Sequence, residues 1–384
     1  MDLITDIFQK GLSYLEILEI LDVKHGIKIS LSTLKRRLRQ RGLKRRALQG
    51  VRNADEEIKD AVQKELEGSG SNIGYRRLRA SLVSKSIVCR HEDVRKIVKA
   101  LDPEGVDLRR RRRLHRRKYV SKGPNYAWHL DGHDKLKPFG FSIHGCIDGF
   151  SRKLIWLEVG PSNKKPEVVA KFYLDAVKKI KGVPKFVKAD NGTEHSVIEP
   201  LHIYLRTLSD ATSGVESFSI ISSTENQRIE SFWSMLQRDR IGWWKRFFQD
   251  LVDLNMFTNS DSVLVDCIRF CFMRVLRQEL NTVRNEWNLH IISKSRNNGP
   301  RGRPYIMYEL PHLYEAENCL AITETDEIDQ FYPCVNTHIA NDVSEEFEEF
   351  AQYFMEEGGL TNPTNASQGL QLYTYLLSKI EEFS

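Results

Sequence analysis

The strongest constraint on the fold is the order of apolar segments between residues 125 and 245. Three short runs rich in β-branched and aromatic residues come first, and the turn at 148–152 joins the second and third as a hairpin. Helix-like and strand-like segments then alternate. The predicted strands are 125–131, 141–147, 153–159, 184–189 and 218–221, and the predicted helices are 166–180, 196–207 and the segment from 225 onward. This order predicts an α/β domain.

Three acidic residues lie at the ends of these segments or within the last one. Asp131 ends the first strand, Asp190 follows the fourth strand, and Glu230 lies in the last helix. Carboxylates are hard oxygen ligands, and a cluster of them suits Mg²⁺ or Mn²⁺. Two such ions can clamp the attacking and leaving oxygens of a phosphodiester. The trio therefore indicates a polynucleotidyl transferase.

Three motifs carry a family resemblance, in order: Trp128-x-x-Asp131, the tripeptide Asp190-Asn191-Gly192, and Glu230 in a helix after a polar turn. Over about residues 120–245 the chain resembles the DDE catalytic core of retroviral integrases and related transposases. The resemblance implies a ribonuclease H-like fold with a mixed five-stranded sheet, in which two strands and a helix bring the carboxylates together. It also implies that these three residues are catalytic, that they bind Mg²⁺ or Mn²⁺, and that the protein works on DNA as a homo-oligomer.

Four other acidic residues lie near the trio in the sequence. Asp134 is three positions after Asp131, but only Asp131 has the Trp-x-x-Asp context. We interpret Asp148 as a structural residue of the hairpin and Glu194 as a residue that faces DNA or solvent. Glu225 is expected to support a helix N-terminus electrostatically.

The charge of the chain changes steeply along its length. Residues 1–130 carry 31 Lys and Arg against 16 Asp and Glu, a net charge of +15. Residues 301–384 carry 3 against 16, a net charge of −13. A basic N-terminal part is typical of nucleic-acid binding. The acidic C-terminal part cannot bind phosphate, and we interpret it as a shield for basic surface or a contact for a basic partner.

Residues 1–50 resemble a helix-turn-helix DNA-binding domain. Ser32 is expected to cap a basic helix at 33–41, which Gly42 ends. Its predicted DNA contacts are the outward-facing cations Lys35, Arg36, Arg37, Arg39 and Arg41. The alternative is an ordinary solvated amphipathic helix.

Residues 51–107 are predicted to form a second, similar module. The stretch Gly74-Tyr75-Arg76-Arg77 resembles the second helix-turn-helix of bacterial insertion-sequence transposases, which carry the same catalytic core next. Arg76 and Arg77 are its predicted DNA contacts, and the alternative is a helical packing module without DNA contact. The basic linker at 108–124 follows, in which Arg110, Arg111 and Arg112 are predicted phosphate contacts, with a merely solvated linker as the alternative.

The catalytic core is predicted to end near 245, followed by a helical extension at 246–300 and an acidic region at 301–384 to which we assign no fold. The aromatic and basic stretch at 242–248 either grips DNA or packs inside a helical layer. Asn226, Gln227, Arg228 and Arg238 are substrate contacts or parts of a solvated face. Cys267 and Cys271 are expected to be buried rather than to bind zinc.

These patterns together predict a DNA transposase or integrase-like enzyme that cleaves DNA and transfers strands. The N-terminus lacks the paired His and Cys zinc pattern of viral integrases, which favours a stand-alone, transposon-derived protein. Two alternatives stay open: a host-adapted, catalytically silent DNA-binding protein, and a ribonuclease H-like nuclease without strand transfer. The chain has no apolar run of transmembrane length and no secretory signal, so we expect an intracellular protein, nuclear if the host is eukaryotic.

Overall fold

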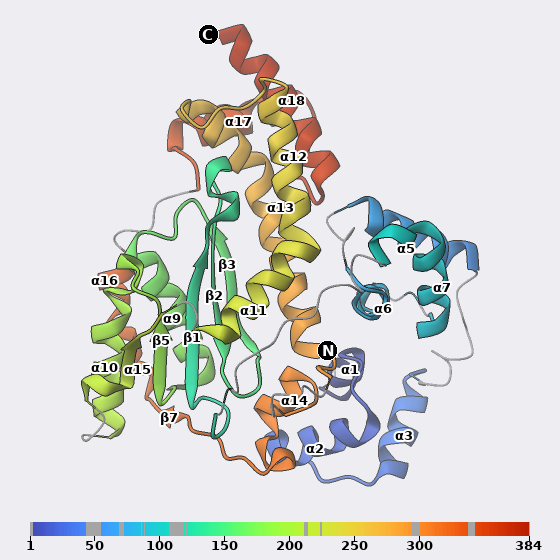
Figure 1. Cartoon of the computed structure of the whole chain (residues 1–384), viewed down its shortest axis with the longest axis vertical. Helices are drawn as coiled ribbons and strands as arrows, with labels where there is room; N and C mark the ends of the chain where they lie inside the picture. The colour runs from blue at the N-terminus through green and yellow to red at the C-terminus, as the bar shows by residue number, and fades with distance from the viewer. Residues whose placement is uncertain are drawn as a thin grey trace. The chain divides into compact units, whose positions relative to one another are not determined.

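The computed structural model describes residues 3–43, 55–68, 73–85, 87, 89–106, 119, 121–210, 214–222, 225–293, 300–336 and 342–383 (Figure 1). The chain forms two compact units, each discontinuous in sequence. The helical unit comprises Met1–Pro124, Arg238–Trp243 and Glu286–Asn318, and the sheet unit comprises Asn125–Gln237, Trp244–Asn285 and Cys319–Ser384. Among the described helices, none is long and apolar enough to cross a membrane.

The sheet unit is built on a five-stranded mixed sheet with the strand order β3-β2-β1-β5-β6. The first three strands pair antiparallel, and the last two continue the sheet in parallel with β1. Their bounds are β1 (Ala127–His133), β2 (Ser142–Asp148), β3 (Leu154–Gly160), β5 (Phe186–Ala189) and β6 (Phe218–Ile220). β2 is buried along its whole length, because both faces of the sheet are covered. The predicted α/β core with a mixed five-stranded sheet is therefore confirmed.

Two helices cover one face of this sheet, α9 (Pro166–Ile180) and α10 (Ile198–Ser209). Trp128 of β1 lies at the centre of their shared core, where its ring meets Trp156 and Tyr173 edge to face at centroid distances of 6.3 Å. Successive strand residues point to opposite faces, so Leu130 enters this core while Asp131 faces the other side. On that other side lies α11 (Gln227–Leu236).

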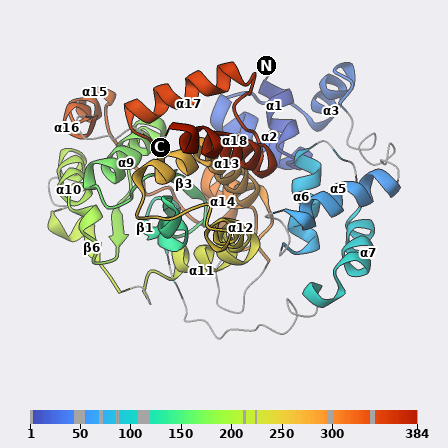
Figure 2. The same cartoon turned by 90° about the horizontal axis from the view of Figure 1, so that it is seen from above.

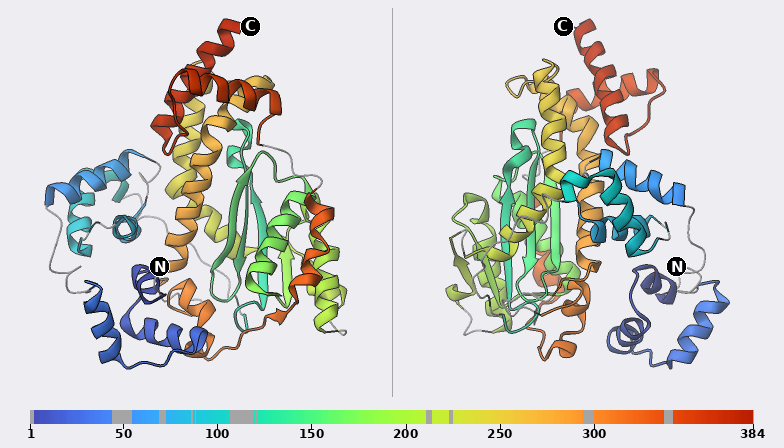
Figure 3. Two further views of the ribbon diagram at one scale, coloured as in Figure 1. Left: turned by 180° about the vertical axis from the view of Figure 1, so that it is seen from behind. Right: turned by 45° about the vertical axis from the view of Figure 1, so that its right-hand side comes forward.

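Part of the acidic C-terminal region belongs to the same core. The short helices α15 (Thr325–Asp329) and α16 (Tyr332–Asn336) lie beside α9 (Figures 2 and 3) and bury Ile328 and Val335 there. Ion pairing supports this contact, because Lys178 of α9 lies 2.6 Å from Asp329. This segment therefore has a structural role in the sheet unit.

A second helical layer in the sheet unit is formed by most of α12 (Gly242–Asp253), most of the long α13 (Ser262–Leu289), α17 (Glu345–Glu357) and α18 (Ala366–Phe383). Trp244 and Phe248 of α12 are buried against Phe272 of α13, so this part of the stretch at 242–248 packs inside the protein. Cys267 and Cys271 are buried on α13, as predicted. The acidic tail meets α13 through polar contacts too, since the Ser344 hydroxyl donates to Asp266 at 2.7 Å.

The helical unit begins with α1 (Leu3–Gln9), α2 (Tyr14–His25) and α3 (Leu31–Gln40), whose apolar residues share one core. Ile306 and Leu310, in or next to α14 (Pro304–Glu309), complete this core, although the sequence placed them in the acidic region. The prediction that Ser32 is the N-cap of α3 is wrong. Ser30 has the extended conformation of a cap, and its hydroxyl accepts from the Thr33 N–H at 3.1 Å. Gly42, with φ +72°, follows the end of α3.

A second core in the helical unit joins α5 (Asp55–Glu67), α6 (Tyr75–Ser84) and α7 (His91–Leu101). Ile58, Val62, Leu78 and Val94 are fully buried in it. The helical character predicted for the N-terminal part of the chain is thus observed. Most of the basic linker, including Arg110, Arg111 and Arg112, lies outside the described residues.

Candidate active site

The strand pairing brings two of the three predicted catalytic acids together. β1 and β5 run in parallel with Trp128 opposite Val187 and His129 opposite Lys188. Continuing that register places Asp190, the residue after β5, opposite Asp131. Asp131 is 8% exposed, whereas the Asp190 side chain is 39% exposed. The site is therefore buried on the β1 side and open to solvent at the end of β5.

Two hydrogen-bonded side chains hold α11 against β1 and aim Glu230 at the same place. The Asn226 amide donates to the Leu130 carbonyl at 2.9 Å, and the Trp233 indole donates to Oδ2 of Asp131 at 2.8 Å. Residues three and four apart share one face of a helix. Glu230 stands four residues after Asn226 and three before Trp233, so it shares the face of α11 that meets β1.

Asn226 itself is a structural residue. It is 1% exposed, and its Oδ1 lies 2.7 Å from Nδ1 of His129, which the amide orientation identifies as the donor. The sequence predicts Asn226 to be either a substrate contact or part of a solvated face. Both readings are wrong, because its polar atoms are used inside the protein.

The indole of Trp233 needs a residue without a side chain beneath it. Gly145 of β2 lies opposite Asp131 in the sheet. A Cβ at Gly145 would come within 2.7 Å of the Trp233 ring. The small residue therefore lets Trp233 lie close to the sheet and reach Asp131.

The electrostatics of the three acids show that they share one environment. Burial raises the pKa of Asp131 to about 7, and the negative charges of Asp190 and Glu230 add to the rise. Burial also raises the pKa of Glu230, with Asp190 contributing again. Three mutually repelling carboxylates fit a divalent cation, because the cation neutralises the charge that burial and repulsion penalise.

Two further residues join Asp190 in a cluster that the sequence did not predict. Ligand atoms of Asp190, Glu194 and His195 all lie within 4.8 Å of one another. Glu194, predicted to face DNA or solvent, is half-buried, and its carboxylate also lies close to Asp190. His195 is 3% exposed, with Nδ1 3.5 Å from Oδ1 of Asp190. The only sequence signal for it is its place five residues after Asp190 in the short turn Thr193–His195.

The remaining acidic residues have other partners. Asp148 is fully buried, and its carboxylate accepts from the Asn125 N–H, the Ser151 N–H and the Ser151 hydroxyl, each at 2.7 Å. These bonds tie the β2–β3 hairpin together and support the structural role predicted for Asp148. Asp134 pairs with Lys137 at 3.0 Å. Glu225, two residues before the start of α11, accepts from the Ser222 hydroxyl at 3.0 Å.

The predicted DNA contacts have different environments. On α3, Lys35, Arg36 and Arg39 are exposed and Arg37 is half-buried; Arg41, directly after α3, is exposed. Arg76 is exposed on α6, and Arg228 is half-buried on α11. The prediction that Arg77 contacts DNA is wrong, because its guanidinium pairs with Asp239 and only 16% of its side chain is exposed. Arg77 is therefore held inside the helical unit rather than presented to phosphate.

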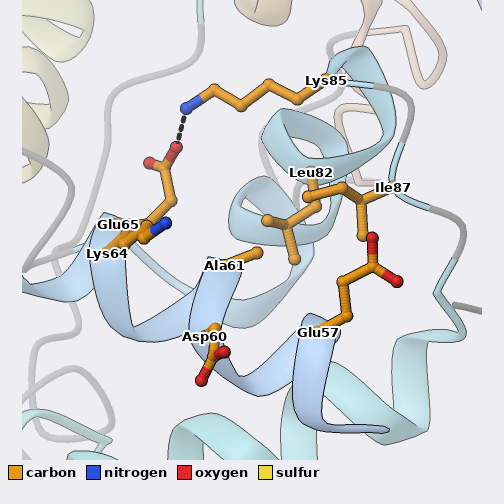
Figure 4. Close-up of a pocket in the computed structure, with 8 residues that line it drawn as sticks. All are labelled: Glu57, Asp60, Ala61, Lys64, Glu65, Leu82, Lys85 and Ile87. Atoms are coloured by element: carbon orange, nitrogen blue, oxygen red, sulfur yellow. Dashed lines mark hydrogen bonds and ion pairs between the residues drawn. The ribbon is translucent and has the colours of Figure 1, made fainter. Parts of the chain in front are cut away.

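A pocket lies beside the second helical core, between α5 and α6. Its lining combines three carboxylates (Glu57, Asp60 and Glu65) with two lysines (Lys64 and Lys85), and Glu65 pairs with Lys85 (Figure 4). The lining is therefore of mixed charge rather than basic. Exposed Arg76 lies on α6 outside that lining.

Comparison with known families identifies one match. Residues 118–309, half of the chain, match the integrase core domain family. The match extends beyond the end predicted near 245, so α12, α13 and α14 fall within the matched region. No curated protein matches the chain.

Proposed function

Since the chain belongs to the integrase core domain family, we propose that it is a DNA transposase or integrase that cleaves phosphodiesters and transfers strands. Asp131, Asp190 and Glu230 are the proposed catalytic residues. The observation that carries the proposal is their convergence: neighbouring parallel strands bring the two aspartates together, and the hydrogen bonds of Asn226 and Trp233 turn Glu230 toward them.

The three carboxylates would hold Mg²⁺ or Mn²⁺. When bound, these ions activate water or a DNA 3′-hydroxyl and stabilise the departing oxygen. The protein's own contribution is to orient the carboxylates. The Trp233 indole donates to Oδ2 of Asp131 and so fixes the orientation of that carboxylate. The Asn226 amide fixes the start of α11, and thereby the height of Glu230 above β1.

DNA is the proposed partner. The exposed cations of α3 suit phosphate contacts, because each one can neutralise a phosphate and release counterions. We include Lys35, Arg36, Arg37, Arg39 and Arg41, together with Arg76, Arg228 and the linker residues Arg110, Arg111 and Arg112. A homo-oligomer on DNA is part of the proposal, as is action where chromosomal DNA lies, the nucleus if the host is eukaryotic.

The test is to incubate the purified protein with nicked and branched DNA in Mg²⁺ or Mn²⁺, beside Asp190→Asn and the control Asp134→Asn. Asp134 is a nearby carboxylate that pairs with Lys137 outside the trio. We expect metal-dependent cutting and joining in the wild type and the control, and neither in Asp190→Asn.

Other outcomes separate the alternatives. Cutting without joined products indicates a nuclease without strand transfer. DNA binding that is equal in all three proteins, with no phosphodiester chemistry on any substrate, refutes the enzyme and supports a DNA-binding protein.

A further inference from the structure

A line of buried nitrogen atoms leads from the sheet to Asp190. Nε1 of Trp156, on β3, lies 3.0 Å from Nδ1 of His144, on β2. Nε2 of His144 lies 3.4 Å from Nε2 of His195. Nδ1 of His195 then lies 3.5 Å from Oδ1 of Asp190. All three rings are at least 97% buried, so the line is closed to solvent.

The hydrogen-bond chemistry of these groups gives the line a direction. An indole N–H can only donate, so Nδ1 of His144 must accept and its Nε2 must carry the proton. That proton points at Nε2 of His195, which must therefore accept. The proton of the neutral His195 ring is then on Nδ1, the atom that faces Asp190.

We propose that His195 is a positioning residue that donates its Nδ1–H to Oδ1 of Asp190 and does not bind the metal. The inference rests on the proposed function, since it assigns the remaining oxygen of Asp190, Oδ2, to the cation. Nδ1 of His195 and Oδ1 of Asp190 are both buried, and neither makes a standard hydrogen bond to any other group among the described residues. The 3.5 Å separation is long for a hydrogen bond, as is common at catalytic sites before ligands bind.

The competing arrangement is a metal held by Asp190, Glu194 and His195, whose ligand atoms are close enough. A ligating Nδ1 must offer its lone pair, which moves the ring proton to Nε2. Two N–H groups of His195 and His144 would then point at each other across 3.4 Å, unless His144 also gave up its bond from Trp156. The hydrogen-bond line therefore opposes a metal ligand at this position.

The direct test reads the tautomers by nitrogen NMR of the full-length protein with ¹⁵N-labelled histidine. His195→Asn and His144→Gln identify the two signals. We expect the proton of His195 on Nδ1 and that of His144 on Nε2, both without metal and after Mg²⁺ is added. A His195 proton on Nε2, or loss of the Nδ1 proton when Mg²⁺ binds, overturns the proposal.

Trp156→Phe tests the same line of hydrogen bonds in a second way. It removes the donor that fixes His144, so we expect the His195 signal to become a mixture of tautomers. An unchanged His195 signal in a folded Trp156→Phe protein contradicts the proposed line of hydrogen bonds. These measurements need no DNA chemistry, so their failure is distinguishable from failure of the proposed function.

A matched pair of substitutions then tests the effect on metal binding. The amide nitrogen of His195→Asn replaces Nδ1, whereas that of His195→Gln replaces Nε2 and leaves Asp190 without its donor. Loss of a side chain that orients a metal ligand typically weakens metal affinity about 10–100-fold. We expect His195→Gln to raise the half-saturating Mg²⁺ concentration by that factor, and His195→Asn to restore it. Equal Mg²⁺ affinity in the two variants refutes the donor role.

Discussion

Replacing Asp131 with Asn should stabilise the protein in the absence of metal while removing its response to metal. The substitution keeps the shape of the side chain and an oxygen that can accept from the Trp233 indole. It removes a negative charge that is 8% exposed and lies near two other carboxylates. In the wild-type protein this buried charge near two other carboxylates lowers the stability of the fold, and the variant lacks it.

The magnitude follows from the pKa of Asp131, which rises from its usual 3.8 to about 7 in the fold. A folded pKa above the unfolded one favours folding of the protonated form. The penalty on the wild type is therefore absent below pH 3.8, grows between pH 3.8 and 7, and is constant above pH 7. At 1.36 kcal/mol per pKa unit, the variant gains about 2 kcal/mol at pH 5 and about 4 kcal/mol at pH 8.

The assay is urea unfolding of both proteins in EDTA at pH 5 and pH 8, followed by tryptophan fluorescence. Repeating it with Mg²⁺ should stabilise the wild type at pH 8 and leave Asp131→Asn nearly unchanged. Asp134→Asn serves as the control, because Asp134 pairs with Lys137 and should give no gain at pH 8. A variant that is no more stable than the wild type at pH 8, or whose advantage shrinks from pH 5 to pH 8, refutes the reasoning.

Three further substitutions test the supports of the site and the DNA surface. Gly145→Ala places a Cβ against the Trp233 ring, so we expect a loss of about 1–3 kcal/mol of stability and a weaker Mg²⁺ response, both measured by urea unfolding. Asp148→Asn removes a hydrogen-bond acceptor from the hairpin and should lower the stability by about 1–3 kcal/mol, while the half-saturating Mg²⁺ concentration stays unchanged. A change in Mg²⁺ affinity would instead place Asp148 in the metal site. Arg36→Ala should weaken DNA binding and reduce its salt dependence by about one ion, whereas Glu57→Gln should leave both unchanged, as measured by fluorescence anisotropy titration. If both variants show the same dependence of binding on salt concentration, α3 does not contact DNA.

The strands of the core could be predicted because each one is a local pattern. β2 and β3 are short apolar runs joined by a turn, and residues 184–189 lead directly to Asp190. Their short length, their β-branched and aromatic residues and the turns beside them favour strands over helices. The proposed catalytic trio rests on three motifs whose order resembles that of the integrase core, and this resemblance implies that they meet in the fold.

The features that escaped prediction depend on contacts between distant parts of the chain. Arg77 looks like a free cation until Asp239 is brought beside it, 162 positions later. α15 and α16 are short, acidic helices, and nothing local indicates that Ile328 packs against α9. His195 is one polar residue in a polar turn, and it acquires a role only through His144, 51 positions earlier. Sequence patterns report propensity and period, whereas these three features are set by tertiary contact.

The support of the carboxylates and their mutual repulsion have a common consequence. Three acids free to move would relax apart, and each would keep water around its charge. Here Trp233 holds Asp131, the Asn226 bond holds the helix of Glu230, and the sheet register holds Asp190, so the repulsion is kept in the folded protein. Burial raises the pKa of Asp131 most, and the repulsion from Asp190 and Glu230 adds to that rise. A divalent cation held by the three carboxylates would offset that repulsion, so the contacts that keep the acids together in the metal-free fold would also pre-organise them for the metal.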